Sequence, residues 1–267
     1  MYLGPLDSRG FSQLLWEVVA NSVDQFLAGD CREIHVEFMS DGSIAIEDDG
    51  LGFPIKEIDG IPLVELACTS PHYTPTLDGH APHEHITPFG VGIFVVNALS
   101  AWMRIDIYRD GHQYSIGFAK GVTTSPLTVA GKTKRTGTRV VFSPDLTVLP
   151  AFRVDMEAFS ARLQELSFLL PGLSLTLRDH RVQVFHHPEG LRAFAEKRPG
   201  HFGEMILPTF EVDDSINGIR VEVAASWWTA TSCTIESFAN VQRTTGGGTH
   251  VRGLRKGLAK AMRKAGS

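Results

Sequence analysis

The chain has 267 residues, of which 43% are hydrophobic and 21% are charged, and its formal net charge is −5. This length suits one large domain, with or without a small second one, and the composition is typical of a globular protein with a sizeable core. No apolar segment approaches the ~18–20 residues that a membrane-spanning helix needs, and the N-terminus does not resemble a secretory signal peptide. The mild negative charge argues against a nucleic-acid-binding surface over the whole protein.

The three cysteines, Cys31, Cys68 and Cys233, lie far apart in the sequence. This spacing predicts neither a disulfide framework nor a thiolate zinc site. A reducing, cytoplasmic location is therefore the default expectation, and no membrane partner is expected.

The first elements predicted along the chain are a helix and two strands. Apolar residues recur at helical spacing between residues 11 and 27, and Gly29 follows them as a stop signal. Two alternating segments, 33–38 and 43–47, then predict strands joined by a tight turn. A long loop is expected over residues 69–90, which are rich in proline, histidine, threonine and glycine.

The middle of the chain alternates helix-like and strand-like segments. An apolar stretch at 93–102 predicts a buried helix, and a second helix is predicted at 155–169, before a Pro-Gly pair. The predicted strands in this part are 104–108, 114–118, 139–142 and a pair within 173–185.

A domain boundary is predicted at Glu196–Phe202, which divides a domain of residues 1–200 from a segment of residues 201–267. The segment predicts strands at 219–224 and 233–238, a triple-glycine loop and a basic terminal helix. Because roughly 65 residues are few for an independent core, we expect the segment to pack on the first domain or to belong to a larger fold.

Two polar residues of the first predicted helix could carry chemistry. Glu17 and Asn21 are four residues apart, so they lie one above the other on one helix face. A carboxylate beside an amide can supply a base and a ligand for Mg²⁺, which prefers oxygen ligands. Taken alone, the pair is explained more simply as two solvated residues.

A second candidate motif is Asp48-x-Gly50-x-Gly52, at the end of the second predicted strand. Glycines there allow positive φ and close approach of a ligand to the backbone. The carboxylate could accept a hydrogen bond from an exocyclic amine such as that of adenine. An ordinary turn explains the isolated motif equally well.

Two further motifs precede regular elements. Gly90-Val91-Gly92 opens a predicted helix, where free amides and the helix dipole favour phosphate. Thr136-Gly137-Thr138 leads into a predicted strand, and its hydroxyls could hold a ligand. Tight packing or a turn is the alternative interpretation of each.

Taken together in this order and spacing, the four motifs resemble the four-box pattern of the GHKL ATPases (gyrase, heat-shock chaperone, histidine kinase and mismatch-repair protein). Within that superfamily, the chain is most similar to the ATPase region of gyrase B subunits and their topoisomerase IV counterparts, collinearly from Met1 to about Leu258. The segments that carry the resemblance are 16–24, 47–54, 90–100, 136–142, 162–169 and 247–250.

The resemblance implies an α/β (α+β) fold, with helices on one side of a mixed, largely antiparallel sheet in a two-layer sandwich, followed by a truncated transducer-like segment. It also implies ATP and Mg²⁺ as ligands, with Glu17 as general base and Asn21 as the Mg²⁺ ligand. Asp48 would accept from the adenine amine. The other positions implied to contact the nucleotide are Gly50, Gly52, Phe53, Gly90, Val91, Gly92 and Thr138.

Several positions depart from the family pattern. Leu51 and Phe53 stand where the family has arginine and isoleucine, and residues 86–89 read Ile-Thr-Pro-Phe where it has Gly-Gly-Leu-His. Leucine cannot supply the pairing or stacking of arginine, and Pro88 removes an amide donor. We therefore expect ATP binding with slow or partner-dependent hydrolysis.

The chain lacks counterparts of the family's N-terminal dimer arm and of the later part of the transducer. We therefore expect no topoisomerase activity from the chain by itself, and a protein partner or a second copy could complete the transducer.

The alternative function is a repurposed gyrase-B-like scaffold that binds or transforms a different small molecule without hydrolysing ATP. Within the histidine-rich segment 72–85, His80, His83 and His85, together with Asp78 and Glu84, could bind a metal or act as acid–base groups, although loop histidines are often unremarkable. The basic C-terminal helix is expected to be solvated. Nucleic acid, if bound at all, would bind there.

Overall fold

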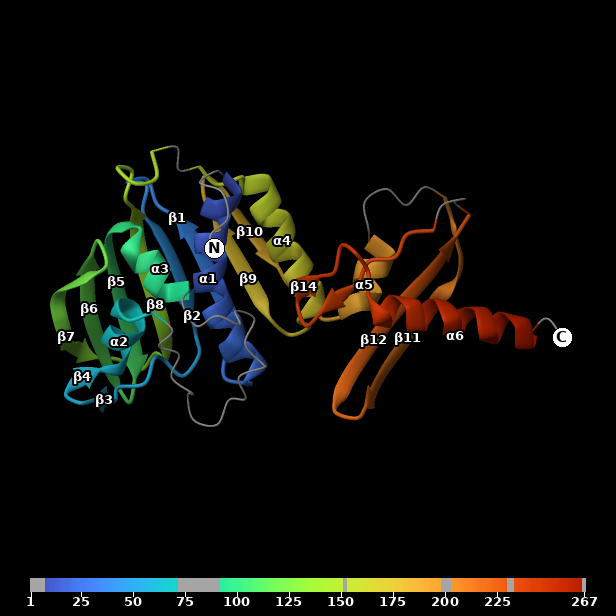
Figure 1. Cartoon of the computed structure of the whole chain (residues 1–267), viewed down its shortest axis with the longest axis horizontal. Helices are drawn as coiled ribbons and strands as arrows, with labels where there is room; N and C mark the ends of the chain where they lie inside the picture. The colour runs from blue at the N-terminus through green and yellow to red at the C-terminus, as the bar shows by residue number, and fades with distance from the viewer. Residues whose placement is uncertain (1–7, 72–91, 151–152, 198–202, 230–232, 266–267) are drawn as a thin grey trace. The chain divides into compact units, whose positions relative to one another are not determined.

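The computed structural model describes residues 8–71, 92–150, 153–197, 203–229 and 233–265, and these form two compact units, Met1–Phe194 and Ala195–Ser267 (Figure 1). The first unit is built on an eight-stranded sheet. The second contains a two-stranded ribbon and a long helix.

The sheet of the first unit is mixed, because β1 and β9 are parallel while every other neighbouring pair is antiparallel. This confirms the predicted mixed, largely antiparallel sheet. Its strands, in spatial order, are β10 (Val182–Phe185), β9 (Ser174–Arg178), β1 (Glu33–Phe38), β2 (Ile44–Asp48), β8 (Gly137–Pro144), β5 (Ser100–Arg109), β6 (His112–Ala119) and β7 (Val122–Lys132).

The helices of the first unit lie on one face of this sheet (Figure 1). Alternation along the strands explains why: Ile34 and Val36 of β1 point into the core and are buried, while Glu33 and His35 point to the other face and are exposed. The two-layer arrangement is therefore confirmed. These helices are α1 (Ser8–Leu27), α2 (Leu63–Thr69), α3 (Gly92–Ala98) and α4 (Met156–Leu169), and a small hairpin, β3 (Glu57–Ile58) and β4 (Ile61–Pro62), precedes α2. A fifth helix, α5 (Gly190–Lys197), contains the boundary between the two units.

In the second unit, β11 (Met205–Ile216) and β12 (Ile219–Trp228) form an antiparallel ribbon. A short pair, β13 (Phe238–Ala239) and β14 (Gln242–Arg243), precedes α6 (Thr249–Ala265). Within the part of the chain that the structure describes, no helix is both long and apolar enough to cross a bilayer.

Two predicted elements are wrong in extent. The helix predicted at 93–102 ends at Ala98, and β5 begins at Ser100, whose hydroxyl donates to the Val96 carbonyl at the end of α3. A continuous apolar stretch gives no signal for this change, because a buried helix and a buried strand have the same composition. The strand predicted at 233–238 is reduced to Phe238–Ala239.

The elements that the sequence did not reveal are α2, α5, β7, β11 and the two-residue strands β3, β4 and β14. Strand β7 is mostly exposed and contains Pro126, so it shows no clear alternation of apolar and polar residues. Its pairing with β6 forms the edge of the sheet.

Candidate functional site

The Asp48 carboxylate, at the end of β2, is buried and receives three hydrogen bonds. Oδ2 accepts from Ser22 Oγ at 2.8 Å, and Oδ1 accepts from the backbone N–H groups of Gly50 at 3.0 Å and Thr138 at 3.2 Å. Burial raises the pKa of Asp48, and these hydrogen bonds oppose the shift. A carboxylate has about four lone-pair positions, so Oδ2 keeps one with no donor among the described residues.

The loop after Asp48 lies directly on the backbone of β5 and β8. Gly52 has φ +76°, and a Cβ there would lie 2.7 Å from the Tyr108 carbonyl oxygen. Thr138 Oγ1 accepts from Phe53 N at 3.1 Å, and Arg109 Nη1 donates to the Gly52 carbonyl at 2.8 Å. Asp48, Gly50, Gly52, Phe53 and Thr138 are thereby brought together.

Gly137, at the start of β8, cannot carry a side chain without displacing this loop. Its φ is +120°, and an added Cβ would overlap the Asp48 carbonyl oxygen and lie 3.1 Å from Asp49 Cα. We expect Gly137→Ala to lower the free energy of unfolding by about 2–4 kcal/mol, measured by urea denaturation. Gly131→Ala is the matched control, because its Cβ would meet nothing within 4 Å. Equal losses in the two variants would contradict this explanation of Gly137.

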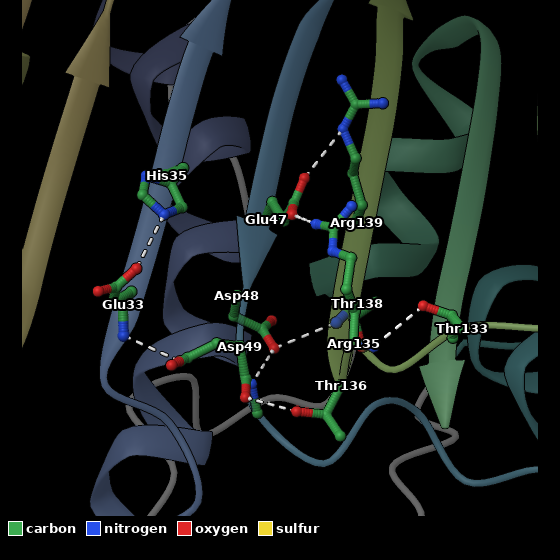
Figure 2. A network of polar contacts seen from close by, with 11 residues as sticks. Glu33, His35, Glu47, Asp48, Asp49, Thr133, Arg135, Thr136, Thr138 and Arg139 are labelled. Carbon is green, nitrogen blue, oxygen red and sulfur yellow. Dashed lines mark hydrogen bonds and ion pairs between the residues drawn. The ribbon is translucent and has the colours of Figure 1, made fainter. Parts of the chain in front are cut away.

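Asp49, adjacent to Asp48, has the opposite pKa shift. Partial burial alone would raise its pKa, but the backbone N–H groups of Arg32 and Glu33 donate to Oδ1 at 2.7 and 2.9 Å and lower it overall. Thr136 Oγ1 donates to the Asp49 carbonyl at 3.2 Å (Figure 2). The Asp49 side chain therefore connects the loop after β2 to the start of β1, while the Asp48 side chain faces the interior.

The polar face of the sheet supports the same loop. Glu47, one residue before Asp48, pairs with both Arg135 and Arg139, and the Arg139 Nε–Glu47 Oε2 distance is 3.3 Å (Figure 2). The Arg135 guanidinium also lies 4.4 Å from the centre of the Tyr108 ring. These contacts hold the 133–138 turn, which supplies Thr138.

Glu17 on α1 is half-buried, and burial raises its pKa, although Gln13 Nε2 donates to Oε1 at 2.7 Å and opposes the shift. The first residue of α3, Gly92, abuts it: an added Cβ would meet the Glu17 carboxylate and lie 3.1 Å from Glu17 Cβ. Asn21 is exposed one turn further along α1. Its neighbour Ser22 connects this helix to Asp48.

Some predicted site residues fall outside the described residues: Gly90 and Val91, residues 86–89 and the histidines of 72–85. Among the described residues, no group of three or more His, Cys, Asp or Glu side chains is placed to hold a metal ion.

Sequence reasoning missed three residues that support the site. Ser22 and Gln13 lie on α1 beside Asn21 and Glu17, and Arg109 precedes the Asp110-Gly111 turn. None had a distinctive motif. Leu51, where the resemblance leads one to expect an arginine, is 48% exposed.

The chain is similar to known proteins along most of its length. Residues 6–148 match the family described as histidine kinase-, DNA gyrase B- and HSP90-like ATPase, and residues 190–267 match DNA gyrase B. The B subunit of DNA topoisomerase 4 of Staphylococcus aureus, in strains MW2 and Mu50, is 38% identical over 270 residues, covering 98% of this chain and 41% of the relative. The chain thus spans less than half the length of these relatives.

A solved structure is similar to this chain over its whole length. The crystal structure of the 43K ATPase domain of Thermus thermophilus gyrase B in complex with an aminocoumarin has a TM-score of 0.86 and 32% sequence identity. The match covers 100% of this chain and 71% of that one.

Proposed function

Because the chain belongs to the family of histidine kinase-, DNA gyrase B- and HSP90-like ATPases, we propose that its first unit binds ATP with Mg²⁺ and hydrolyses it. The observation that carries the proposal is the buried Asp48 carboxylate, which keeps one accepting position on Oδ2. A buried, ionised acceptor is costly unless a donor completes it, and the exocyclic amine of adenine is such a donor. Gly52, Phe53 and Thr138 would border the base.

At the phosphate end, the residues that fit the chemistry are Glu17, Asn21 and Gly92. The Asn21 amide oxygen is a suitable Mg²⁺ ligand, and bound Mg²⁺ would neutralise charge on the phosphates. Glu17 would take a proton from the attacking water, and a raised pKa suits a general base near neutral pH. Gln13 would orient the Glu17 carboxylate through its hydrogen bond to Oε1.

We also propose that turnover is slow or depends on a protein partner, since Leu51 and Pro88 replace residues that the family uses near the nucleotide. Residues 1–200 would form the ATP-binding domain and 201–267 a transducer-like segment. The DNA topoisomerase 4 polypeptide that the chain resembles is one subunit of an enzyme, so a partner chain or a second copy is proposed here too. We expect no topoisomerase activity from this chain alone.

Thermal unfolding with different ligands tests the proposal directly. A ligand at about 100 times its Kd stabilises the folded state by about 2.7 kcal/mol. We expect the largest rise in Tm with ATP and Mg²⁺, a smaller rise with ATP and a chelator, and the smallest with adenosine. Asn21→Ala should remove the difference that depends on Mg²⁺ and keep the response to adenosine.

No rise with any adenine compound would contradict the proposal. Stabilisation by an unrelated small molecule would then favour the alternative function, a scaffold with a different ligand.

A further inference from the structure

Asn97, near the end of α3, is a polar side chain in the core of the first unit. Its exposed fraction is 0%. Nδ2 donates a hydrogen bond to the Cys68 carbonyl at 2.9 Å, but Oδ1 has no hydrogen-bond partner among the described residues. Burying an amide that is only partly paired costs stability, so stability alone does not explain an asparagine at this position.

The hydrogen bond that Asn97 makes joins two helices. Carbonyl groups in the last turn of a helix have no partner within that helix. At the end of α2, Ser70 N donates to the Leu66 carbonyl, and Asn97 supplies the donor for the Cys68 carbonyl from 29 positions further along the chain. The Asn97 amide therefore connects the end of α2 to α3.

The same end of α3 is also attached to the sheet. Ser100, the first residue of β5, donates from Oγ to the Val96 carbonyl at 2.6 Å. Asn97 and Ser100 thus hold the C-terminal end of α3 from two directions, one on α2 and one on β5.

The other end of α3 covers Glu17. Helix α3 contacts both α1 and α2. A Cβ added to Gly92, the first residue of α3, would lie 3.1 Å from Glu17 Cβ and 3.3 Å from the Glu17 carboxyl carbon, so the backbone of Gly92 packs directly on this side chain. At 1.5 Å per residue, Asn97 lies only about 7.5 Å along the helix axis from Gly92. A displacement of α3 at Asn97 would therefore reach Glu17.

We propose that Asn97 is a positioning residue for ATP hydrolysis: its bond to Cys68 fixes α3, and α3 holds Gly92 against the Glu17 carboxylate. The kinetic part of this inference rests on the proposed function. Asn97 acts through Glu17 and does not contact the nucleotide. A small displacement of a catalytic group is enough to slow a reaction strongly.

Asn97→Leu tests the role of the amide. Leucine has the same branched skeleton, with methyl groups in place of the amide oxygen and nitrogen, so it removes both the bond to Cys68 and the buried oxygen without a donor. We expect kcat for ATP hydrolysis to fall by about 10–100-fold, because Glu17 is misplaced, and the Kd for ATP to stay within about threefold of the wild type.

Thr69→Val is the matched control. It removes the bond from Thr69 Oγ1 to the Glu65 carbonyl, at 2.7 Å, which lies within α2 and does not involve α3. This variant should keep the kcat of the wild type.

A double variant separates positioning from a general structural loss. Two residues that act as a unit have non-additive effects. Adding Asn97→Leu to Glu17→Gln should therefore slow turnover no further than Glu17→Gln does alone. In the single Asn97→Leu variant, the acidic side of the kcat–pH profile should move to lower pH, because a displaced α3 exposes the Glu17 carboxylate and removes part of the burial that raises its pKa.

A carbon-13 NMR titration of the Glu17 carboxyl group in the nucleotide-free protein needs no turnover. We expect a lower pKa of Glu17 in Asn97→Leu than in the wild type, and no change in Thr69→Val. Failure of the wild type to bind or hydrolyse ATP would contradict the proposed function, and this titration would still decide the role of Asn97. Circular dichroism checks that Asn97→Leu folds; Asn97→Ala, which removes the same donor without added bulk, replaces it otherwise.

An unchanged pKa of Glu17 in the Asn97 variant would overturn the inference, whatever the rate. Additive losses in the double variant would overturn it too, because Asn97 would then act independently of Glu17. Equal losses of kcat in Asn97→Leu and Thr69→Val would reduce the effect to general destabilisation of α2.

Discussion

Asp48→Asn should weaken ATP binding by about 100-fold, which corresponds to about 2.7 kcal/mol. An asparagine in the same orientation keeps an oxygen toward the N–H groups of Gly50 and Thr138, and the Ser22 hydroxyl can turn to accept from the new NH₂ group. The NH₂ group would then face the adenine amine, so two donors would meet. Isothermal titration with ATP and Mg²⁺ measures the loss.

The same substitution should not harm the empty protein. Burial raises the pKa of Asp48 in the fold above its value in the unfolded chain. Ionisation of the Asp48 carboxyl therefore lowers the free energy of unfolding. This loss is absent below the pKa that Asp48 has in the unfolded chain, and it is complete above the pKa that Asp48 has in the folded protein. Asparagine removes it, so Asp48→Asn without nucleotide should have a Tm at pH 7 no lower than that of the wild type. A lower Tm would mean that the binding loss reflects misfolding.

Glu17→Gln should leave ATP affinity within a few-fold of the wild type and reduce turnover by about 10²–10⁴-fold. Glutamine has nearly the same shape and still accepts from Gln13, but it cannot take a proton from water. Steady-state phosphate release and equilibrium ATP binding, measured on the same preparation, separate the two effects.

Glu37→Gln is a suitable control for the Glu17 variant, because Glu37 lies on the polar face of β1, away from the helices. It should keep wild-type turnover. The wild-type pH profile gives a second check: because burial raises the pKa of Glu17, turnover should fall on acidification at a higher pH than an ordinary glutamate would give. Unimpaired turnover in Glu17→Gln would remove this residue from the mechanism.

The sequence predicted the elements in which apolar residues recur at a regular spacing. α1 and β1 lie where the apolar spacing places them, and the order of the four motifs correctly indicated the family. The sequence could not reveal that α3 ends at Ala98, because the residues on both sides of this end are mostly apolar. It could not reveal β7 either, because the side chains of this strand are mostly exposed.

Within the candidate site, sequence reasoning named the groups with distinctive chemistry and missed the residues that hold them. Asp48 and Thr138 were named from motifs, but Ser22 and Arg109 contact the site only through the fold, with partners 26 and 57 positions away along the chain. A serine beside Asn21 and an arginine before a turn have no signal of their own in the sequence. Their roles depend on which strands become neighbours.

The one parallel pairing of the sheet affects how the protein is made. Glu33 of β1 pairs with Ser174 of β9, so on a ribosome the early strand has an open hydrogen-bonding edge until most of the domain has emerged. Such edges recruit strands from other molecules and favour aggregation. Any shortened form for expression should therefore extend beyond Phe185, where the last strand of the sheet ends.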